Sequence, residues 1–233
     1  INSAKDDAAG LQISSRLTSQ VNGLNQGSRN ANDAISLAQT AEGALDEYTN
    51  TVQRMRTLAV QASNGSNTEA DLAALDTEYS ELELELTRIS EQTSFGGTSL
   101  LDSSYSANFQ IGADAGQTIS ISISASFSAA AIGAAGTLTT FADAQSVITN
   151  LDSVLSTVNT TRSDLGAKQN RFSSVIRSND NAAENVSASR SRIEDTDYAA
   201  ESAMLARNSV LQQASSSMLA QANQQPQIAL SLL

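Results

Sequence analysis

A heptad pattern between residues 141 and 193 constrains the fold of this chain more than any other feature. Apolar or small residues recur there at alternating steps of four and three, interrupted only by Gly166. This spacing is typical of a helix that packs a continuous seam against other helices. At 1.5 Å per residue the helix would be about 80 Å long, so it requires partners of similar length, from this chain or from neighbouring copies. The seam positions are Val147, Leu151, Val154, Val158, Thr161, Leu165, Lys168, Phe172, Val175, Asn179, Ala182, Val186, Ser189 and Ile193.

A second seam, in a helix predicted for residues 5–63, supplies such a partner. Gly23, Gly27 and Gly43 lie inside it, and each costs up to about 1 kcal/mol relative to alanine, so packing must hold this helix together. Residues 64–67 (NGSN) then predict a helix stop and a turn. The seam positions are Leu17, Val21, Leu24, Ser28, Ala31, Ile35, Ala38, Glu42, Leu45, Thr49, Val52, Arg56 and Ala59.

A third helix is predicted for residues 69–92, with Thr68 or Asn67 as its cap. Eight carboxylates and a single arginine lie between residues 69 and 91. Because Glu81, Glu83 and Glu85 step by two, they splay around the helix instead of converging, and we interpret this face as solvated. The apolar stripe consists of Leu72, Leu75, Tyr79, Leu82, Leu86 and Ile89.

Residues 93–140 predict a small β-structure. The sequence TSFGG at 93–97 indicates a turn, and residues 118–124 (TISISIS) alternate as a half-buried strand does. This strand is predicted to pair with residues 108–111 across a turn at 112–117. A two-stranded hairpin is not stable alone, so it should lie on the helices. The Ala/Ser/Gly-rich run that follows, to about Gly136, predicts a low-complexity loop.

The C-terminal part is notable for its lack of charge. Residues 194–197 (EDTD) are predicted to cap a final helix from about Tyr198 to Gln225. No charged residue follows Arg207 in the remaining 26 positions. An uncharged amphipathic helix is typical of a segment that is buried in an assembly or held by a partner, and its glutamines and serines argue against a membrane span. Its apolar stripe consists of Leu205, Leu211, Ala214, Met218, Leu219 and Ala222.

Composition excludes several classes of function. The chain has no cysteine and no histidine, which rules out disulfides, thiolate or imidazole metal sites and Ser-His or Cys-His catalysis. We therefore expect no enzyme activity, metal or cofactor. A net charge of -12 argues against nucleic acid or an anionic membrane as partner. Four tyrosines, five phenylalanines and no tryptophan suit thin helix-on-helix packing, so the predicted fold is mainly α: a long antiparallel helical rod, like a coiled-coil bundle, with a small β-hairpin region.

Five sequence blocks, in this order, resemble the bacterial flagellin family. The resemblance covers almost the whole chain apart from residues 124–140, and it is more specific than heptads, which occur in many helical proteins. The blocks are INSAKDDAAG at 1–10, QRMRTLAVQA at 53–62, TSFGG at 93–97 followed by LL at 100–101, FQIGA at 109–113, and AQANQQPQ at 220–227.

The resemblance implies a subunit of the flagellar filament that self-assembles for motility. Residues 1–196 would form the rod-like domain, residues 197–233 an inner-tube segment, and the short middle little or no outer domain. Repeated heterologous contacts between copies give an open filament instead of a closed ring. The family is extracellular, exported through the flagellar secretion apparatus without a cleaved signal peptide. Family members begin with a further helix upstream of residue 1, so we take the chain as a fragment or processed form and expect it to form filaments poorly by itself.

The resemblance also implies a surface for the Toll-like innate flagellin receptor. Its expected contacts are an arginine, a leucine and a glutamate, with three polar residues close by in sequence. Alternatively, the leucine packs in the core, the charges are ordinary surface groups, or the same surface serves subunit contacts. An arginine beside an apolar anchor fits the usual composition of interface hot spots. The residues are Gln53, Arg54, Leu58, Gln61, Asp71 and Glu78.

A second implied partner is the flagellin export chaperone, which holds the C-terminal segment before secretion. Packing between subunits explains the same residues equally well. Two further functions remain open: a hook-filament junction protein, which shares the terminal helices of flagellin, and a flagellin-like cell-surface adhesin. The residues of this second site are Leu205, Leu211, Met218, Leu219 and Ile228.

Overall fold

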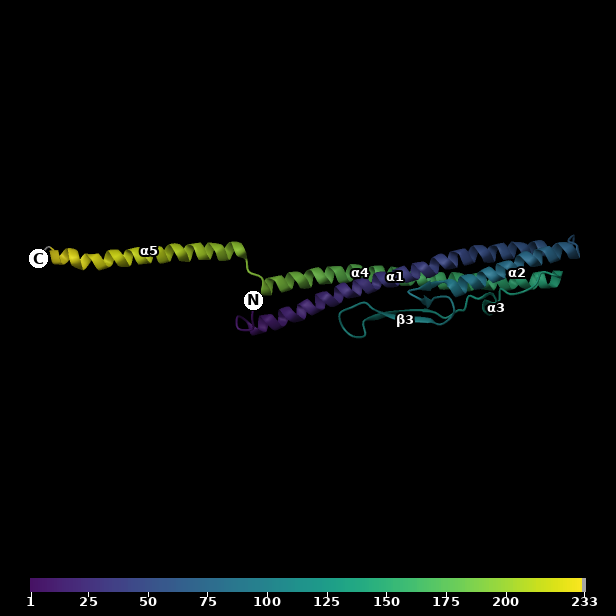
Figure 1. Cartoon of the computed structure of the whole chain (residues 1–233), viewed down its shortest axis with the longest axis horizontal. Helices are drawn as coiled ribbons and strands as arrows, with labels where there is room; N and C mark the ends of the chain where they lie inside the picture. Colours follow the sequence, from purple (N-terminus) through teal and green to yellow (C-terminus); the bar gives the residue numbers. More distant parts are fainter. Residues whose placement is uncertain (232–233) are drawn as a thin grey trace. The chain divides into compact units, whose positions relative to one another are not determined.

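The structure, a computed structural model, describes the backbone of residues 1–231 and the side chains of residues 1–222. It confirms a mainly α fold with small antiparallel strand pairs (Figure 1). Within the described residues, no helix is long and apolar enough to cross a membrane. The elements are α1 (Ala8–Ala62), α2 (Glu69–Gln92), β1 (Ser94–Phe95), β2 (Thr98–Ser99), β3 (Tyr105–Gln110), β4 (Thr118–Ile123), α3 (Ala129–Ile132), α4 (Phe141–Glu194) and α5 (Tyr198–Ser231).

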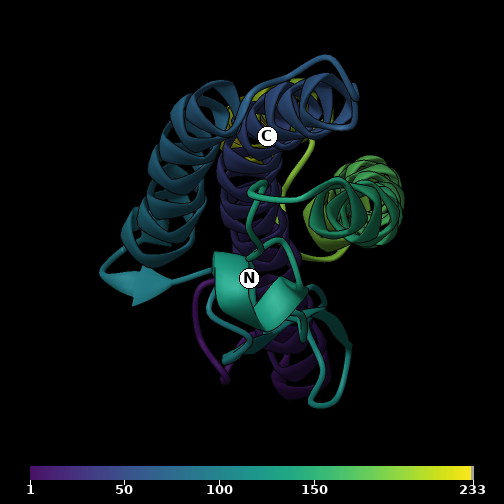
Figure 2. The ribbon, with the colours of Figure 1, turned by 90° about the vertical axis from the view of Figure 1, so that its right-hand side faces the viewer.

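Contacts divide the chain into two compact units. One consists of residues 1–18 and 187–233, and the other of residues 19–186. The predicted domain boundary at residues 196–197 falls inside the first unit and stays a prediction. In the second unit α1, α2 and α4 run alongside one another, and the segment from β1 to α3 lies along one side of them (Figures 1 and 2).

The seam predicted for α4 is confirmed. Every buried residue of this helix except Ala144 lies on it. On α1, Asp46 and Arg56 are ten residues apart, and their ion-pair partners Arg162 and Asp152 are ten residues apart in the opposite direction along α4. The two helices are therefore antiparallel in this unit, with the seams facing each other. The N–O distances are 3.1 Å for Arg162–Asp46 and 2.7 Å for Arg56–Asp152.

The prediction that α1 buries a single seam was incomplete. A second row of residues, spaced by seven, is also buried, each with at most 2% of its surface exposed. The end-on view shows α1 between α2 and α4 (Figure 2), so this helix buries two faces instead of one. The sequence did not separate these faces because alanine occurs on both. The second row is Ala34, Ala41, Tyr48, Met55 and Ala62.

The predicted hairpin is confirmed as β3 and β4, paired from Tyr105↔Ile123 to Gln110↔Thr118. Its first strand spans residues 105–110 instead of the predicted 108–111. Its alternation is strict: the side chains of β4 alternate between exposed and buried, with the isoleucines inward. The Phe109 ring packs edge-on against Phe172 of α4, with centroids 5.9 Å apart. The hairpin therefore lies on the helices, as a marginal two-stranded sheet requires.

The turn of this hairpin is fixed by two asparagines. The side-chain amide of Asn30 donates to the Gln110 carbonyl at 2.8 Å, and that of Asn179 donates to the Ile111 carbonyl at 2.7 Å. Asn179 is only 8% exposed, and it occupies a seam position of α4. A polar residue in the seam is thus explained by the carbonyl that it satisfies.

A second, smaller hairpin was missed. Ser94 pairs with Ser99, and Phe95 with Thr98, where the sequence predicted only a turn. Gly96 and Gly97 both have positive φ, 60° and 84°. Two consecutive residues of this kind form the turn that matches the twist of a two-residue hairpin.

The predicted loop after residue 124 is instead a packed segment, which we call the central segment (residues 124–140). It contains the short helix α3 and buries Phe127 and Leu138 completely, each with 0% exposure. Four polar side chains of α2, spaced by three or four residues along one face, bond to its backbone. The bonds run from Leu138 N to Asp76 Oδ1 (2.6 Å), from Tyr79 Oη to Ala134 O (2.5 Å), from Gly136 N to Glu83 Oε1 (2.7 Å) and from Ala129 N to Thr87 Oγ1 (3.4 Å).

These bonds correct the prediction that the carboxylates of α2 form a purely solvated face. Asp76 and Glu83 are half-buried and accept hydrogen bonds from main-chain N–H groups of the central segment. A low-complexity sequence cannot order itself through its own side chains. It is ordered here because the neighbouring helix satisfies its main chain.

The burial of Glu83 predicts a pH effect. Burial raises the pKa of Glu83 above its ordinary value of 4.5, and the bond from Gly136 lowers it less than burial raises it. The folded state therefore holds this proton more tightly than the unfolded chain does. The Glu83 contribution to stability is largest in acid and declines as the pH rises from 4.5 through the folded pKa.

We expect Glu83→Gln to remove this decline. In urea unfolding at a series of pH values, the difference in unfolding free energy between the variant and the wild type should grow in favour of the variant above pH 4.5. The matched control is Glu81→Gln on the exposed side of the same helix. A pH-independent difference for Glu83→Gln would contradict the assignment.

The unit that contains α5 has fewer contacts. The Ser14 hydroxyl bonds to the Glu194 carboxylate, and Arg190 Nη1 donates to Thr18 Oγ1 at 3.2 Å. Asp197 caps α5 as predicted, since its carboxylate accepts from Ala199 N and Ala200 N at 3.0 and 3.1 Å.

Four predicted helix limits need correction. The first long helix spans Ala8–Ala62 instead of residues 5–63, and α4 ends at Glu194, one residue later than predicted. The predicted end of the final helix near Gln225 was wrong, because α5 continues to Ser231 through Pro226. Proline in a helix interior removes one main-chain donor and crowds the carbonyl four residues earlier, which is why the sequence predicted an end there.

Candidate functional site

Arg54 of α1 and Glu78 of α2 form an exposed ion pair on the surface predicted to bind the receptor. Arg54 Nε and Nη2 both donate to Glu78 Oε1, at 2.8 and 2.6 Å. The two side chains keep 54% and 45% of their surface exposed. An exposed ion pair contributes only about 0–1 kcal/mol to stability, so little is lost if a partner rearranges it. Because both side chains are exposed, their charges and hydrogen-bonding groups are available to such a partner.

Two of the other predicted residues lie on the same faces of these helices. Gln61 follows Arg54 by seven residues, and Asp71 precedes Glu78 by seven, so both are displaced by one heptad toward the turn that joins α1 to α2. Both side chains are exposed, as is Gln53, which is next to Arg54. The structure thus places four polar residues on the same faces of two adjacent helices, with Gln53 exposed about 100° around α1 from Arg54.

Asp71 also has a structural role. It forms a capping box with Thr68: Thr68 N donates to Asp71 Oδ2 at 2.9 Å, and Asp71 N donates to Thr68 Oγ1 at 3.3 Å. The hydrogen bonds from the Thr68 main chain and hydroxyl lower the pKa of Asp71. A change at this position therefore affects the start of α2 as well as the surface.

Leu58 does not belong to this surface. Its side chain is 1% exposed and packs in the hydrophobic core. The sequence left two assignments open for this residue, a receptor anchor and a core residue, and its burial makes it a core residue. The apolar contact predicted for its side chain is not accessible.

The second predicted site lies on α5. Leu205, Leu211, Met218 and Leu219 are 71%, 52%, 69% and 69% exposed. Every side chain from residue 195 to residue 222 is exposed, so no described side chain of α5 is buried against another element. Ile228, the fifth predicted residue, lies outside the described side chains.

Three exposed apolar residues of α5 were missed by the sequence analysis: Tyr198, Met204 and Val210. Met204 precedes Leu211 by seven residues, and Leu211 precedes Met218 by seven, which places these three side chains in one row along the helix. Heptad spacing alone could have identified Met204.

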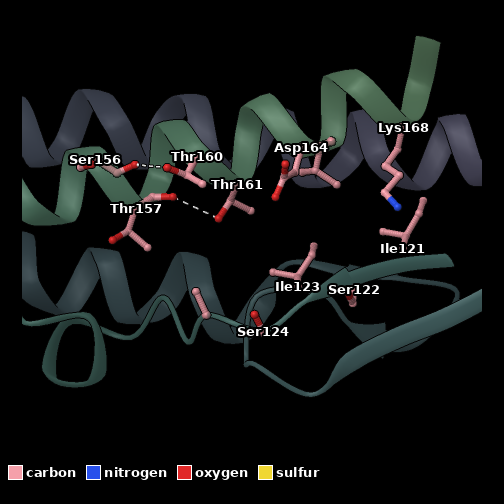
Figure 3. Close-up of a pocket in the computed structure, with 12 residues that line it drawn as sticks. Ile121, Ser122, Ile123, Ser124, Ser156, Thr157, Thr160, Thr161, Asp164 and Lys168 are labelled. Carbon is pink, nitrogen blue, oxygen red and sulfur yellow. Dashed lines mark hydrogen bonds between the residues drawn. The ribbon is translucent and has the colours of Figure 1, made fainter. Parts of the chain in front are cut away.

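A polar pocket lies between α4 and the end of β4 (Figure 3). It has a volume of about 530 Å³. The hydroxyls of Thr157, Thr160 and Thr161 line it, but each donates to the main-chain carbonyl four residues earlier. Asp164 and Lys168 are the charged residues of the lining. This arrangement places no activated nucleophile beside a base, so we assign the pocket no chemistry.

The acidic side chains that the structure describes form no metal site. Among the residues that the structure describes, no group of three or more His, Cys, Asp or Glu side chains lies close enough to bind a metal ion.

Comparisons with known proteins identify the family. Residues 1–106 match the bacterial flagellin N-terminal helical region, and residues 148–233 match the bacterial flagellin C-terminal helical region. A flagellin of Halalkalibacterium halodurans is 48% identical over 239 aligned positions, which cover 100% of this chain and 87% of that protein. The chain belongs to the bacterial flagellin family.

Other flagellins support this assignment. Flagellin B of Vibrio cholerae is 39% identical over 338 positions that cover all of this chain and 90% of that protein. Among solved structures, Bacillus cereus flagellin has a TM-score of 0.60 and 32% identity, covering 65% of this chain and 88% of that chain. A putative flagellar hook-associated protein of Vibrio parahaemolyticus has a TM-score of 0.69, with 82% of this chain and 100% of that chain covered, but at 14% identity the likeness concerns the fold alone.

Membership of the flagellin family determines the broad function. Flagellins are structural subunits of the extracellular flagellar filament that polymerise with other flagellin subunits, and they are not enzymes; this chain is accordingly a member of a family of filament subunits. The fold is shared with the putative hook-associated protein, and the sequence relatives reported above are flagellins.

Proposed function

We propose that this flagellin associates with other copies through the apolar side chains of α5. The observation that carries the proposal is the complete exposure of a long helix: every described side chain from 195 to 222 is exposed, including Met204, Leu211 and Met218. Isolated helices gain most of their stability from packing an apolar face. A partner that covers this row would stabilise α5 and remove a large apolar surface from water.

The absence of charge supports a partner that buries the helix deeply. Arg207 is the last charged residue, so the helix beyond it can be enclosed without desolvating an ion. Glutamine and serine can still form hydrogen bonds within the assembly.

This proposal can be tested by sedimentation velocity over a range of protein concentrations. Although we expect filaments to form poorly, the wild type should associate into small assemblies as its concentration rises. Leu211→Glu should weaken that association at least about tenfold, because the new carboxylate would be buried in the contact. The control is Gln213→Glu, which adds the same charge nearly half a turn away from the row. A wild type that stays monomeric, or a Leu211→Glu variant that associates as the wild type does, would refute the proposal.

We propose further that the export chaperone holds the same face of α5 before the subunit leaves the cell through the flagellar secretion apparatus without signal cleavage. The contacts would be Leu205, Leu211, Met218 and Leu219, with Ile228 beyond the described side chains. Because one face cannot contact two partners at once, adding the chaperone should reverse the concentration-dependent association. Association that persists in excess chaperone would place the chaperone elsewhere.

A second proposed function is recognition by the Toll-like flagellin receptor through Arg54, Glu78, Gln53, Gln61 and Asp71. The supporting observation is the exposed Arg54–Glu78 pair, flanked by polar residues on two helices. Arginine is prominent among interface hot spots because its planar group forms several directed hydrogen bonds. Leu58 is proposed to support Arg54 from the core without contacting the receptor.

Binding of the purified receptor ectodomain would test this surface. Arg54→Ala should reduce the affinity at least about tenfold, as expected for a hot spot. Arg56→Ala is the control, because Arg56 forms a similar exposed pair with Asp152 on a different side of α1. Equal losses for both variants, or no loss for Arg54→Ala, would contradict the assignment.

A further inference from the structure

We propose that Asn64 is a modification site at which spontaneous deamidation converts asparagine to aspartate and isoaspartate. The chain contains two Asn-Gly pairs, Asn22–Gly23 and Asn64–Gly65. Both have a glycine after the asparagine, so no β-carbon shields the following main-chain nitrogen. The sequence alone therefore does not distinguish them, but their structural settings differ.

Asn64–Gly65 lies in the exposed turn between the end of α1 at Ala62 and the start of α2 at Glu69. The Asn64 Oδ1 atom accepts a hydrogen bond from Ser66 N at 3.2 Å. This is the hydrogen bond of an Asx turn, which holds the Asn64 carboxamide close to the main chain of the residues that follow it.

The attacking nitrogen is also available. Within the part of the chain that the structure describes, Gly65 N donates no hydrogen bond. A β-carbon built on Gly65 would meet no atom within 4 Å, so the surroundings leave room for a ring to form and for water to enter. Neither helix has to open for the reaction.

The reaction balances without any co-reactant except water. Gly65 N loses its proton and attacks Asn64 Cγ, so a C–N bond forms to the main chain while the C–N bond to the side-chain nitrogen breaks. That nitrogen leaves as ammonia. Water then opens the five-membered succinimide at either carbonyl, which gives aspartate or, with the main chain rerouted through the side chain, isoaspartate.

Asn22–Gly23 is the internal control. Gly23 is an interior residue of α1, so its N–H belongs to the helical hydrogen-bond pattern. A β-carbon on Gly23 would lie 2.8 Å from Ala113 Cα, which means that the hairpin turn packs directly on this glycine. The nitrogen of Gly23 becomes available only when this part of α1 opens.

Deamidation of Asn64 would change the turn in two ways. It adds a negative charge to a chain whose net charge is already -12. Isoaspartate also lengthens the main chain by one methylene at residue 64. In the unmodified turn, Asn67 N donates to the Asn64 carbonyl at 3.1 Å, and the Asn67 side-chain amide donates to the Gln61 carbonyl in the last turn of α1 at 2.7 Å. We therefore expect the isoaspartyl form to loosen the connection between α1 and α2.

The test is incubation of the folded protein at mildly alkaline pH, followed by peptide mass spectrometry and enzymatic methylation of isoaspartate. Asn64 should deamidate at least roughly tenfold faster than Asn22, because the Asn22 site requires local opening of the helix. In urea, where both turns and helices are lost, the two sites should react at similar rates. Gly65→Ala should slow the reaction at Asn64, and Asn64→Gln should abolish the signal from that peptide.

Two results would overturn the proposal. One is an Asn64 that stays unmodified in the folded protein under conditions in which the unfolded chain reacts at both sites. The other is equal reactivity of Asn22 and Asn64 in the folded protein. The urea arm ensures that a lack of reaction in the folded state reports on the structure and not on the chemistry.

Discussion

Replacing Phe127 with alanine is expected to lower the free energy of unfolding by about 3–5 kcal/mol. Phe127 is 0% exposed, and its ring packs edge-on against Tyr48 of α1 with centroids 5.6 Å apart. Its N–H also donates to the Leu101 carbonyl at 3.0 Å. Truncation would remove one of the largest fully buried side chains of the chain's described part, together with its contact to Tyr48, and would leave a cavity there. Urea unfolding followed by circular dichroism would measure the effect.

The matched control is Phe141→Ala. Phe141 begins α4 and is 59% exposed, so its truncation should change the unfolding free energy by no more than about 0.5 kcal/mol. If the two variants lose similar stability, or if Phe127→Ala is as stable as the wild type, the central segment is not packed as described.

Gly27→Ala is expected to destabilise the protein by about 1–3 kcal/mol, although alanine is the better helix former. A β-carbon at this position would lie 2.4 Å from the Ile111 carbonyl oxygen and 2.6 Å from the Ile111 carbonyl carbon. Because these are main-chain atoms, the hairpin turn would have to move away, and the bond from Asn179 to the same carbonyl would be strained. Hydrogen exchange should then show faster exchange in β3 and β4.

Gly43→Ala on the same helix should change the free energy of unfolding in the opposite direction. No atom lies within 4 Å of the position that its β-carbon would take, so the substitution should stabilise α1 by about 0.5–1 kcal/mol through helix propensity. The same substitution at two positions of one helix would thus stabilise the protein at one position and destabilise it at the other. A stabilising effect at both positions would show that the hairpin does not contact Gly27.

The sequence by itself determined the features that depend on local periodicity. The heptad spacing of α4 predicted which of its faces is buried, and the alternation TISISI predicted both β4 and its inward isoleucines. The uncharged stretch after Arg207 predicted an amphipathic helix, and its apolar residues Leu211 and Met218 are exposed; that a partner covers them stays a prediction. These patterns are readable because each repeats along one element and needs no knowledge of its neighbours.

The candidate receptor surface was only partly predictable. Arg54 and Glu78 are 24 residues apart in sequence, and only the resemblance to flagellins linked them. No local pattern distinguishes Leu58, a buried residue, from an exposed hydrophobic anchor. Its burial follows from the presence of neighbours on two sides of α1, which buries a second face of that helix.

Only the tertiary structure decided how the parts with weak patterns are held. The central segment is rich in Ala, Ser and Gly, and its order comes from Asp76, Tyr79, Glu83 and Thr87 of α2, which bond to its main chain across more than 40 residues of sequence. The close contact at Gly27 and the different settings of the two Asn-Gly pairs have the same origin. A main-chain group finds its partner through space, so its environment depends on the packing of distant elements rather than on the residues beside it.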